Sequence, residues 1–321
     1  MIGIRKVLTA AVAAVAAFGI GAATAQERLT LKSAASTSSY YAMMVQLAEL
    51  LRTEANLAPT VEESQGSVQN VKEAAARPGN FLFTTPPSLL VAAKNRTGQF
   101  KDDPAFDGAR TLFVMPYVTL HIVARADSGI RSMSDLAGKN VVSGGTGTFC
   151  EGRTRAVLNA LNLADKVKIV EVELAAAPAA MRNRQIDAYS TCSSHPTPAL
   201  TELATTLDVI VVPLSPEEQS KVIALDAQSG PITIAAGTYK GQSADVPTVG
   251  VPVGAYGTVS MSDDVAYAIT KTFWENRVKL AGERPWWAGV NEGLVKYLWA
   301  PVHPGAARYY AEKGIAVPTG N

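Results

Sequence analysis

The amino-acid sequence predicts an α/β fold in which mixed, mostly parallel β-sheets are flanked by helices. Short apolar segments alternate along the chain with segments whose apolar residues recur every three to four positions, the patterns of strands and amphipathic helices. Repeated strand–helix–strand units bring strands together in parallel and place helices on both faces of the sheet. The chain has 321 residues, and chains longer than roughly 250 to 300 residues usually split into domains. We therefore expect two domains.

The first 25 residues are predicted to be a secretory signal peptide. Arg5 and Lys6 form a basic start, residues 7–20 are apolar and uncharged, and residues 23–25 match the small-x-small pattern of a cleavage site. The apolar stretch is shorter than the roughly 20 residues that a helix needs to cross a bilayer, which argues against the alternative, a permanent N-terminal anchor. We expect the mature protein to begin at Gln26 and to work in the periplasm, without access to ATP or reduced nicotinamides.

The balance of charges argues against partners that require a strongly basic face. The chain carries 29 Lys and Arg against 28 Asp and Glu. Nucleic acids and anionic membrane surfaces bind concentrated positive charge, and the sequence contains no polybasic run. We expect no nucleic-acid partner and no direct membrane insertion after the signal peptide is cleaved.

The two cysteines, Cys150 and Cys192, leave a disulfide open. Disulfides persist in oxidising compartments such as the periplasm, but separation in sequence does not show whether two Cα atoms lie within bonding range. Metal binding is not expected, because His121, His195 and His303 are far apart and no His or Cys pair has metal-site spacing. The sequence predicts neither a metal nor a cofactor.

Strands and helices can be placed along the chain from these patterns. Ser215 followed by Pro216 is typical of a helix start, with serine as N-cap and proline at the first helical position. Ser262 precedes two aspartates that favour the positive end of a helix dipole. The predicted strands cover residues 29–32, 60–62, 81–84, 118–124, 140–142, 167–172 and 209–212.

Four turns that are rich in glycine or small polar residues are predicted to follow strands and to precede helices. They are residues 36–39, 66–67, 144–148 and 190–194. Open parallel sheets bind ligands beyond the carboxyl ends of their strands, and a helix N-terminus offers unpaired N–H groups to an anion. A single turn of this kind is more often only a helix cap, but four in the same topological position favour an anion-binding site.

The candidate ligand-binding residues lie in or beside these turns. Arg153 and Arg155 follow the glycine turn, where a guanidinium either pairs with a ligand carboxylate or remains a solvated surface charge. Tyr40 offers a ring with a hydroxyl group, whereas Tyr41 is expected to pack in the core. The candidates are Ser38, Ser39, Tyr40, Ser67, Thr85, Thr146, Gly147, Thr148, Arg153, Arg155 and Ser193.

Catalytic motifs are not found, and the protein is not expected to be an enzyme. Residues 147–154 nearly match a phosphate-binding P-loop, but Arg153 replaces the required lysine. Cys150 stands where a dinucleotide-binding fingerprint needs its third glycine. No GxSxG or SxxK nucleophile motif is present.

Several segments of the mature chain match, in order, the segments of one family of transport proteins. Residues 38–41 (Ser-Ser-Tyr-Tyr) are similar to the family's Gly-Thr-Tyr-Tyr turn, and residues 66–70 (Gly-Ser-Val-Gln-Asn) to its Gly-Ser-Val-Glu-Asn segment. The other matching segments are residues 125–130, 136–139, 195–199, 237–239, 245–249 and 303–306. On these segments the chain resembles the TAXI-family solute-binding proteins of tripartite ATP-independent periplasmic (TRAP) transporters, over nearly its whole mature length.

The resemblance implies a two-lobed periplasmic binding protein of type II-like fold with a ligand cleft between the lobes. Lobe I would comprise residues 26–122 and 248–321, and lobe II residues 123–247. The lobes would close around a small organic anion, such as a dicarboxylate, a 2-oxo acid or a glutamate-like ligand. The closed form would deliver this ligand to the membrane subunits of a sodium-coupled TRAP permease.

Departures from the family pattern favour a ligand without an amine. Ser36 and Ser38 replace family glycines, and the loop after Thr148 is bulkier than usual. An amino acid needs an acidic or carbonyl-rich pocket for its ammonium group, and Glu151 is the sole acid in the candidate turns. Cys192 falls in the second loop of the same lobe, so a disulfide at the cleft wall is conceivable.

Two other functions stay open. The first is an ATP-binding-cassette (ABC) receptor with the same two-lobed fold and a sulfonate or aromatic acid as ligand. The second is a periplasmic enzyme on a similar scaffold, since fold alone does not fix function. The enzyme would need a reactive group of residues that the sequence does not offer.

Overall fold

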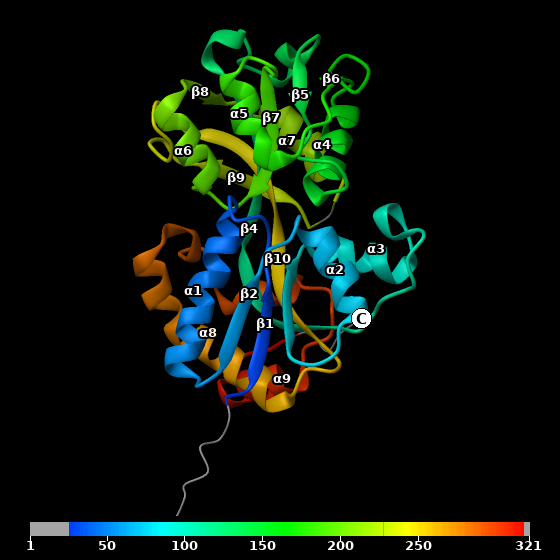
Figure 1. Ribbon diagram of the computed structural model, residues 1–321, viewed down its shortest axis with the longest axis vertical. Helices are drawn as coiled ribbons and strands as arrows, with labels where there is room; N and C mark the ends of the chain where they lie inside the picture. Colours follow the sequence, from blue (N-terminus) through cyan, green and yellow to red (C-terminus); the bar gives the residue numbers. More distant parts are fainter. Residues whose placement is uncertain (1–25, 227, 318–321) are drawn as a thin grey trace, which may run out of the picture.

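Two lobes stacked along the long axis are joined by two long strands, β4 and β10 (Figure 1). The structure is a computed structural model that describes residues 26–226 and 228–317. The predicted signal peptide, residues 1–25, lies outside the described residues. Among the residues that are described, no helix is long and apolar enough to cross a membrane.

The secondary-structure elements alternate as the sequence pattern predicts. The strands are β1 (Arg28–Lys32), β2 (Ala58–Glu62), β3 (Phe81–Thr85), β4 (Ala109–Arg125), β5 (Asn140–Val142), β6 (Lys168–Ile169), β7 (Ala188–Ser193), β8 (Val209–Val211), β9 (Gly230–Ile234) and β10 (Val246–Thr258). The α-helices are α1 (Ser39–Glu54), α2 (Ser67–Ala76), α3 (Pro87–Asn95), α4 (Phe149–Ala160), α5 (Ala177–Arg182), α6 (Pro198–Thr206), α7 (Pro216–Ile223), α8 (Asp263–Glu283) and α9 (Pro304–Glu312).

One continuous mixed sheet passes through both lobes. Its strand order is β2-β1-β3-β10-β4-β7-β5-β6, with β8 paired to β4 and β9 paired to β10. The short strands pair in parallel, β1 with β2 and β3, and β5 with β6 and β7. The long strands β4 and β10 run antiparallel to each other and to the strands beside them. They carry the chain from one lobe to the other.

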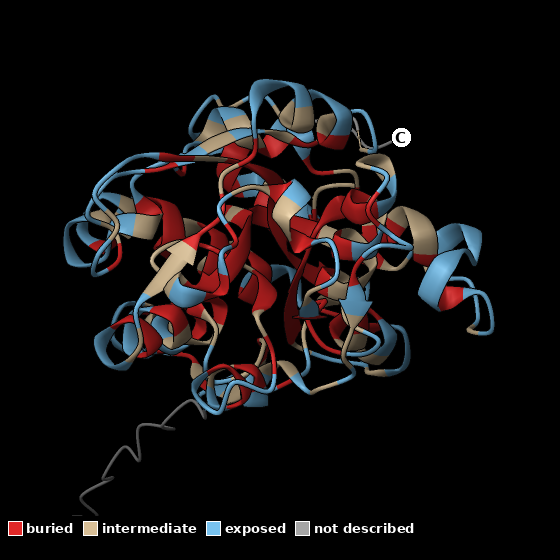
Figure 2. Ribbon diagram, turned by 90° about the horizontal axis from the view of Figure 1, so that it is seen from above, coloured by how far each residue is buried: buried red, intermediate tan, exposed pale blue. Residues whose placement is uncertain are grey.

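The hydrophobic core is divided in the same way as the elements. One cluster of buried side chains draws on residues 29–118 and 251–310. Two further clusters draw on residues 120–249. We call the part around the first cluster lobe I (β1–β3, α1–α3, α8 and α9) and the part around the other two lobe II (β5–β9 and α4–α7). Buried residues gather in the interior and exposed residues lie on the outer helices (Figure 2).

Three helix starts follow the local chemistry of their first residues. Ser38 caps α1, and its hydroxyl oxygen accepts a hydrogen bond from the Tyr40 amide. Thr148 caps α4 in the same way through the Glu151 amide. The helix start predicted at Ser215 is present in α7, where Ser215 and Glu218 form a capping box. These contacts satisfy N–H groups that a helix leaves unpaired at its first turn.

Some strands differ from the prediction. Residues 190–194, predicted as a turn before a helix, mostly belong to β7, and α6 begins only at Pro198. β7 lies between β4 and β5, so its small residues are buried inside the sheet. The strand predicted at 118–124 begins at Ala109, and β10 was not predicted. Both long strands are buried along nearly their whole length, so they lack the alternation that marks a half-exposed strand.

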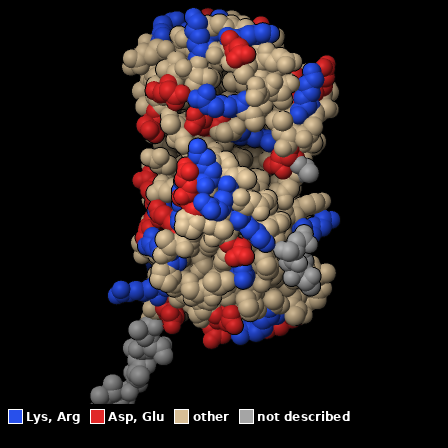
Figure 3. All heavy atoms as spheres, turned by 90° about the vertical axis from the view of Figure 1, so that its right-hand side faces the viewer, with Lys and Arg blue, Asp and Glu red and all other residues tan. Residues whose placement is uncertain are grey.

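Charged side chains are spread over the one face of the molecule that Figure 3 shows. Lys and Arg alternate there with Asp and Glu on both lobes, and neither sign forms a continuous area (Figure 3). This distribution matches the near balance of basic and acidic residues in the sequence.

Candidate functional site

A cavity lies between the lobes, where the carboxyl ends of β1 and β3 face lobe II. Its volume is about 100 Å³. A cavity of this volume has room for several water molecules. Its position agrees with the rule that ligands bind beyond the carboxyl ends of parallel strands. The polar residues in its wall are Ser33, Thr37, Ser38, Tyr40, Gln65, Ser67 and Thr84 from lobe I, and Thr148, Tyr189, Thr191, Ser193 and Thr197 from lobe II.

The wall of this cavity combines uncharged polar groups with apolar side chains such as Phe149, Leu174 and Val253. Within the described part of the chain, no Lys, Arg, His, Asp or Glu side chain lines it. Hydrogen bonds from hydroxyl groups, an amide side chain and the backbone are therefore the polar interactions that the wall can offer. An ammonium group placed here would find no carboxylate partner.

Four helices present their N-termini to the cavity. Their N-cap residues are Ser38 of α1, Gly66 of α2, Thr148 of α4 and Thr197 of α6, and all four line the wall. Gly66 has a φ of +110°, a conformation that L side chains rarely adopt. Some first-turn amides are already paired, such as those of Tyr40 and Glu151 with their own caps. The partial positive charge of the helix N-termini still favours a bound anion without any cationic side chain.

The lobes contact each other along one side of the cavity. Ser193 of β7 lies against the N-terminus of α1: its hydroxyl is 2.6 Å from the Ser39 hydroxyl and 3.1 Å from the Ser38 hydroxyl. The Ser39 amide also donates to the Ser193 hydroxyl at 3.2 Å. On α4, Phe149 packs against the core of lobe I. The structure therefore holds the two lobes together around the cavity.

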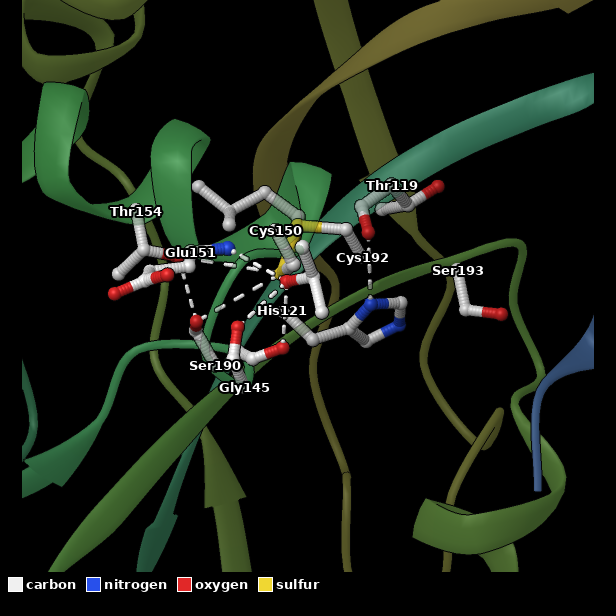
Figure 4. The surroundings of a disulfide bond; sticks show 12 residues. Thr119, His121, Gly145, Cys150, Glu151, Thr154, Ser190, Cys192 and Ser193 are labelled. Atoms are coloured by element: carbon white, nitrogen blue, oxygen red, sulfur yellow. Dashed lines mark hydrogen bonds between the residues drawn. A yellow bond between two sulfur atoms is a disulfide. The ribbon is translucent and has the colours of Figure 1, made fainter. Parts of the chain in front are cut away.

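A disulfide bond forms part of the cavity wall. Cys150, in the first turn of α4, is joined to Cys192 of β7, so the pairing that the sequence left open is present. Figure 4 shows the bond between helix and strand, with Thr154 and Ser190 beside it. The hydroxyls of these two residues are 2.6 Å apart. These links hold the N-terminus of α4 against β7.

Five of the predicted site residues line the cavity: Ser38, Tyr40, Ser67, Thr148 and Ser193. The Tyr40 hydroxyl is already used, because it donates to the Pro116 carbonyl at 2.5 Å.

Two further candidates, Ser39 and Thr85, are fully buried beside the cavity but are not part of its wall. Ser39 contacts it only through Ser193. The Thr85 hydroxyl donates to the Pro86 carbonyl at 3.3 Å.

The remaining candidates on and before α4 lie away from the cavity. The Thr146 hydroxyl donates to Glu171 at 2.9 Å, and the Gly147 amide donates to Glu151 at 2.6 Å. Arg155 forms ion pairs with the same two carboxylates, each at 2.9 Å. These residues therefore form a network on the outer side of the glycine turn.

Arg153 is also directed away from the cavity. Its guanidinium donates to the Ser229 hydroxyl at 2.6 Å, and burial lowers its pKa. The positions of Arg153 and Arg155 around the axis of α4 explain why neither side chain reaches the cavity. The N–H groups of the first turn of α4 are directed toward the cavity, whereas these two side chains point to other surfaces.

Sequence reasoning missed several residues of the wall, among them Ser33 and Tyr189. Ser33 directly follows β1, so the rule that directed attention to strand ends could have identified it. Tyr189 directly precedes the predicted turn at residues 190–194, but the strand before that turn was not located in the sequence, so Tyr189 was not identified. Both side chains are fully buried, at 0% and 1% exposure. Among the described residues, neither hydroxyl has a hydrogen-bond partner.

Solved structures with a similar fold include periplasmic binding proteins. The periplasmic binding protein BugD has 13% sequence identity and a TM-score of 0.57, covering 92% of this chain and 100% of that one. MatC from Rhodopseudomonas palustris with bound malate has 12% identity and a TM-score of 0.56, covering 90% and 96%. At these identities the likeness shows the fold. It confirms the predicted two-lobed α/β architecture, the type II fold of periplasmic binding proteins.

A family model supports a more specific assignment than the fold. The model of the NMT1-like family matches residues 31–314, which include both lobes, both crossing strands and every residue of the cavity wall. The protein therefore belongs to the NMT1-like family.

Proposed function

We propose that the protein is a periplasmic solute-binding protein that captures a small organic carboxylate between its lobes and delivers it to a membrane permease. The observation that carries this proposal is the convergence of four helix N-termini on an interlobe cavity without an ionised side chain. In the finer form of the proposal, the permease belongs to a TRAP transporter and this chain is a TAXI-type receptor. It would work in the periplasm after cleavage behind Ala25.

The chemistry of the wall favours a carboxylate that carries no amine. Backbone N–H groups at the helix starts and hydroxyls such as that of Ser67 can hold a carboxylate with charge-assisted hydrogen bonds. Among the residues that the structure describes, no acid in the wall is available for an ammonium group, and an unpaired charge is costly to bury. The proposed ligand classes are therefore 2-oxo acids, hydroxy acids and dicarboxylates ahead of glutamate.

Closure of the lobes would couple capture to delivery. We propose that residues 26–122 with 248–321 and residues 123–247 move as two bodies, with the hinge in β4 and β10. A ligand that contacts both lobes binds the closed state more tightly than the open state and so shifts the population toward closure. The permease would then recognise the closed form.

Thermal unfolding of ligand-stripped mature protein against a panel of acids tests this function. The panel contains dicarboxylates including malate, which the similar MatC structure holds, together with 2-oxo acids, amino acids and sulfonates. A ligand at about a thousand times its Kd adds roughly 4 kcal/mol to the unfolding free energy. For a domain of this size that is a shift on the order of 10 °C.

The outcome of the panel separates the competing functions. A large shift with one carboxylate supports the proposal and identifies the ligand. A shift only with a sulfonate or an aromatic acid favours the ABC-type receptor instead. Chemical conversion of a bound ligand by the purified protein favours the periplasmic enzyme. A panel without any shift rejects the proposed site.

A further inference from the structure

Two buried hydroxyl groups in the cavity wall have no hydrogen-bond partner within the described chain. One is the Ser33 hydroxyl, directly after β1 in lobe I, and the other is the Tyr189 hydroxyl, on β7 in lobe II. Leaving a buried hydroxyl unpaired costs about 1–3 kcal/mol, and most buried polar groups in proteins are satisfied. Because each lobe contributes one unpaired hydroxyl to the same cavity, we expect a bound molecule that hydrogen-bonds to both lobes at once.

The surroundings of Ser33 hold it in place without using its hydroxyl. Its backbone carbonyl accepts hydrogen bonds from the Ser64 hydroxyl at 2.9 Å and from the Asn70 amide at 2.7 Å. Its amide donates to the Glu62 carbonyl at 3.0 Å. The backbone of this residue is therefore fixed at the cavity while the side chain stays free to bond a ligand.

Tyr189 is held equally firmly. Its backbone lies in the sheet between β4 and β5, and its ring belongs to a hydrophobic cluster of lobe II. Burial raises its pKa, so the phenol is neutral at physiological pH and can donate a hydrogen bond. A neutral phenol can donate to an oxo oxygen of the ligand or accept from its hydroxyl, while the helix N-termini hold the carboxylate.

We propose that Ser33 and Tyr189 are specificity-determining residues that recognise a hydroxyl or oxo oxygen on the ligand, next to the carboxylate held by the helix N-termini. This inference rests on the proposed function and narrows its ligand to 2-hydroxy and 2-oxo carboxylates. A plain carboxylate of the same length leaves both hydroxyls unpaired and binds more weakly. Sites with buried polar groups discriminate strongly against analogues that leave those groups unsatisfied.

The test compares variants that remove only a hydroxyl, Tyr189→Phe and Ser33→Ala, with the matched control Tyr256→Phe. Tyr256 is also fully buried with an unpaired hydroxyl, but it does not line the cavity. Binding is measured by calorimetry with two pairs of acids, malate against succinate and 2-oxoglutarate against glutarate. Within each pair the ligands differ by the 2-oxygen.

We expect opposite effects on stability and on binding. Removing an unpaired buried hydroxyl should raise, or leave unchanged, the unfolding temperature of all three ligand-free variants. Tyr189→Phe and Ser33→Ala should weaken binding of the 2-oxygen ligand about 2- to 10-fold, the value of one hydrogen bond. Their binding of the plain acid should change little, so the preference within each pair falls. Tyr256→Phe should keep the preference of the unaltered protein.

Each other outcome has a distinct meaning. Binding of the 2-oxygen acids with an unchanged preference in both cavity variants overturns the assignment but leaves the proposed function intact. If the unaltered protein binds succinate as tightly as malate, or glutarate as tightly as 2-oxoglutarate, or more tightly, the assignment is likewise overturned and the proposed function stays intact. Lower ligand-free stability in both variants assigns the residues a structural role. Failure of the unaltered protein to bind any carboxylate rejects the proposed function, and this inference with it.

Discussion

At the scale of single residues, His121 is a buried histidine whose pKa folding lowers strongly. It lies in β4, where its Nδ1 is 3.1 Å from the Thr119 carbonyl and its Nε2 is 3.0 Å from the Tyr239 hydroxyl. Burial, reinforced by the nearby imidazole of His195, lowers the pKa of His121 to about 3. The folded protein therefore holds this buried side chain neutral.

The depressed pKa predicts that acid destabilises the fold. An unfolded histidine takes up a proton below about pH 6.5, whereas folded His121 does not until about pH 3. Above pH 6.5 His121 is neutral in both states, so it does not contribute to the pH dependence of the unfolding free energy. As pH falls from there toward 3, the unfolded state binds more protons, so the unfolding free energy decreases by about 1.4 kcal/mol per pH unit.

Urea denaturation at pH 7, 6, 5 and 4 measures this slope, with His121→Gln as the comparison. The glutamine does not titrate, and its amide oxygen can accept from Tyr239. In His121→Gln we expect the slope to decrease by the contribution of one proton. Burial also lowers the pKa values of His195 and His303, and their contributions to the slope should remain. An unchanged slope would contradict the assignment to His121.

At the scale of secondary-structure elements, the N-terminus of α4 brings together the cap, the disulfide and the cavity wall. Thr148 accepts from the Glu151 amide at 3.1 Å and donates to the carbonyls of Gly144 and Gly145, each at 2.9 Å. Gly144 has a φ of +105°, and a Cβ there would lie 2.6 Å from the Cβ of Cys150. The glycine turn, the cap and the disulfide thus depend on one another.

Thr148→Ala should weaken both the fold and the ligand site. Loss of an N-cap costs about 0.5–2 kcal/mol of unfolding free energy, and ligand affinity should fall because the helix start forms part of the proposed carboxylate site. Thr148→Ser should retain most of both properties. Urea unfolding and calorimetric titration with the carboxylate found in the panel measure them.

Ser215→Ala provides the matched control at the scale of elements. Ser215 caps α7 through the Glu218 amide and does not line the cavity. It should lose similar stability and no affinity. If Thr148→Ala lost stability but kept full affinity, α4 would not be part of the site.

At the scale of the whole molecule, the lobes also approach each other where α4 faces lobe I. A Cβ built at Gly152 of α4 would lie 2.9 Å from the side-chain nitrogen of Gln99, which belongs to the 3₁₀ turn Gly98–Phe100 in lobe I. Because the atom is the end of an exposed, flexible side chain, a Cβ alone would only move Gln99. A much larger side chain would extend from α4 toward lobe I.

Gly152→Trp is expected to hold the lobes apart and to reduce ligand affinity about tenfold or more. The apparent Kd rises in proportion as the binding-competent closed state becomes less populated. Calorimetry measures the affinity, and small-angle X-ray scattering measures whether ligand still makes the molecule more compact.

Gly282→Trp is the control for this substitution. Gly282 also lies in a helix, α8, but a Cβ there meets nothing within 4 Å. This variant should bind and close normally. Normal closure and affinity in Gly152→Trp would show that the contact between α4 and lobe I is not needed for binding.

Comparison of the predicted and observed sites shows where sequence reasoning succeeds. The caps Ser38, Thr148 and Ser215 could be predicted because a cap depends on residues within one helical turn. The side-chain directions of Arg153 and Arg155 could not, because they depend on how α4 is rotated against the rest of lobe II. Tyr189 was missed since a strand buried on both faces shows no alternating pattern.

The sequence by itself determined the alternation of strands and helices, the places where helices begin and the kind of polar group found there. These properties follow from hydrogen bonds and apolar periodicity within a few consecutive residues. Only the tertiary structure decided that four helix N-termini meet at one cavity, that Cys150 is joined to Cys192, and that both predicted arginines point elsewhere. Those outcomes depend on strand register and on packing between segments distant in the sequence, 42 residues apart for the two cysteines and 154 for Ser39 and Ser193, which no local pattern records.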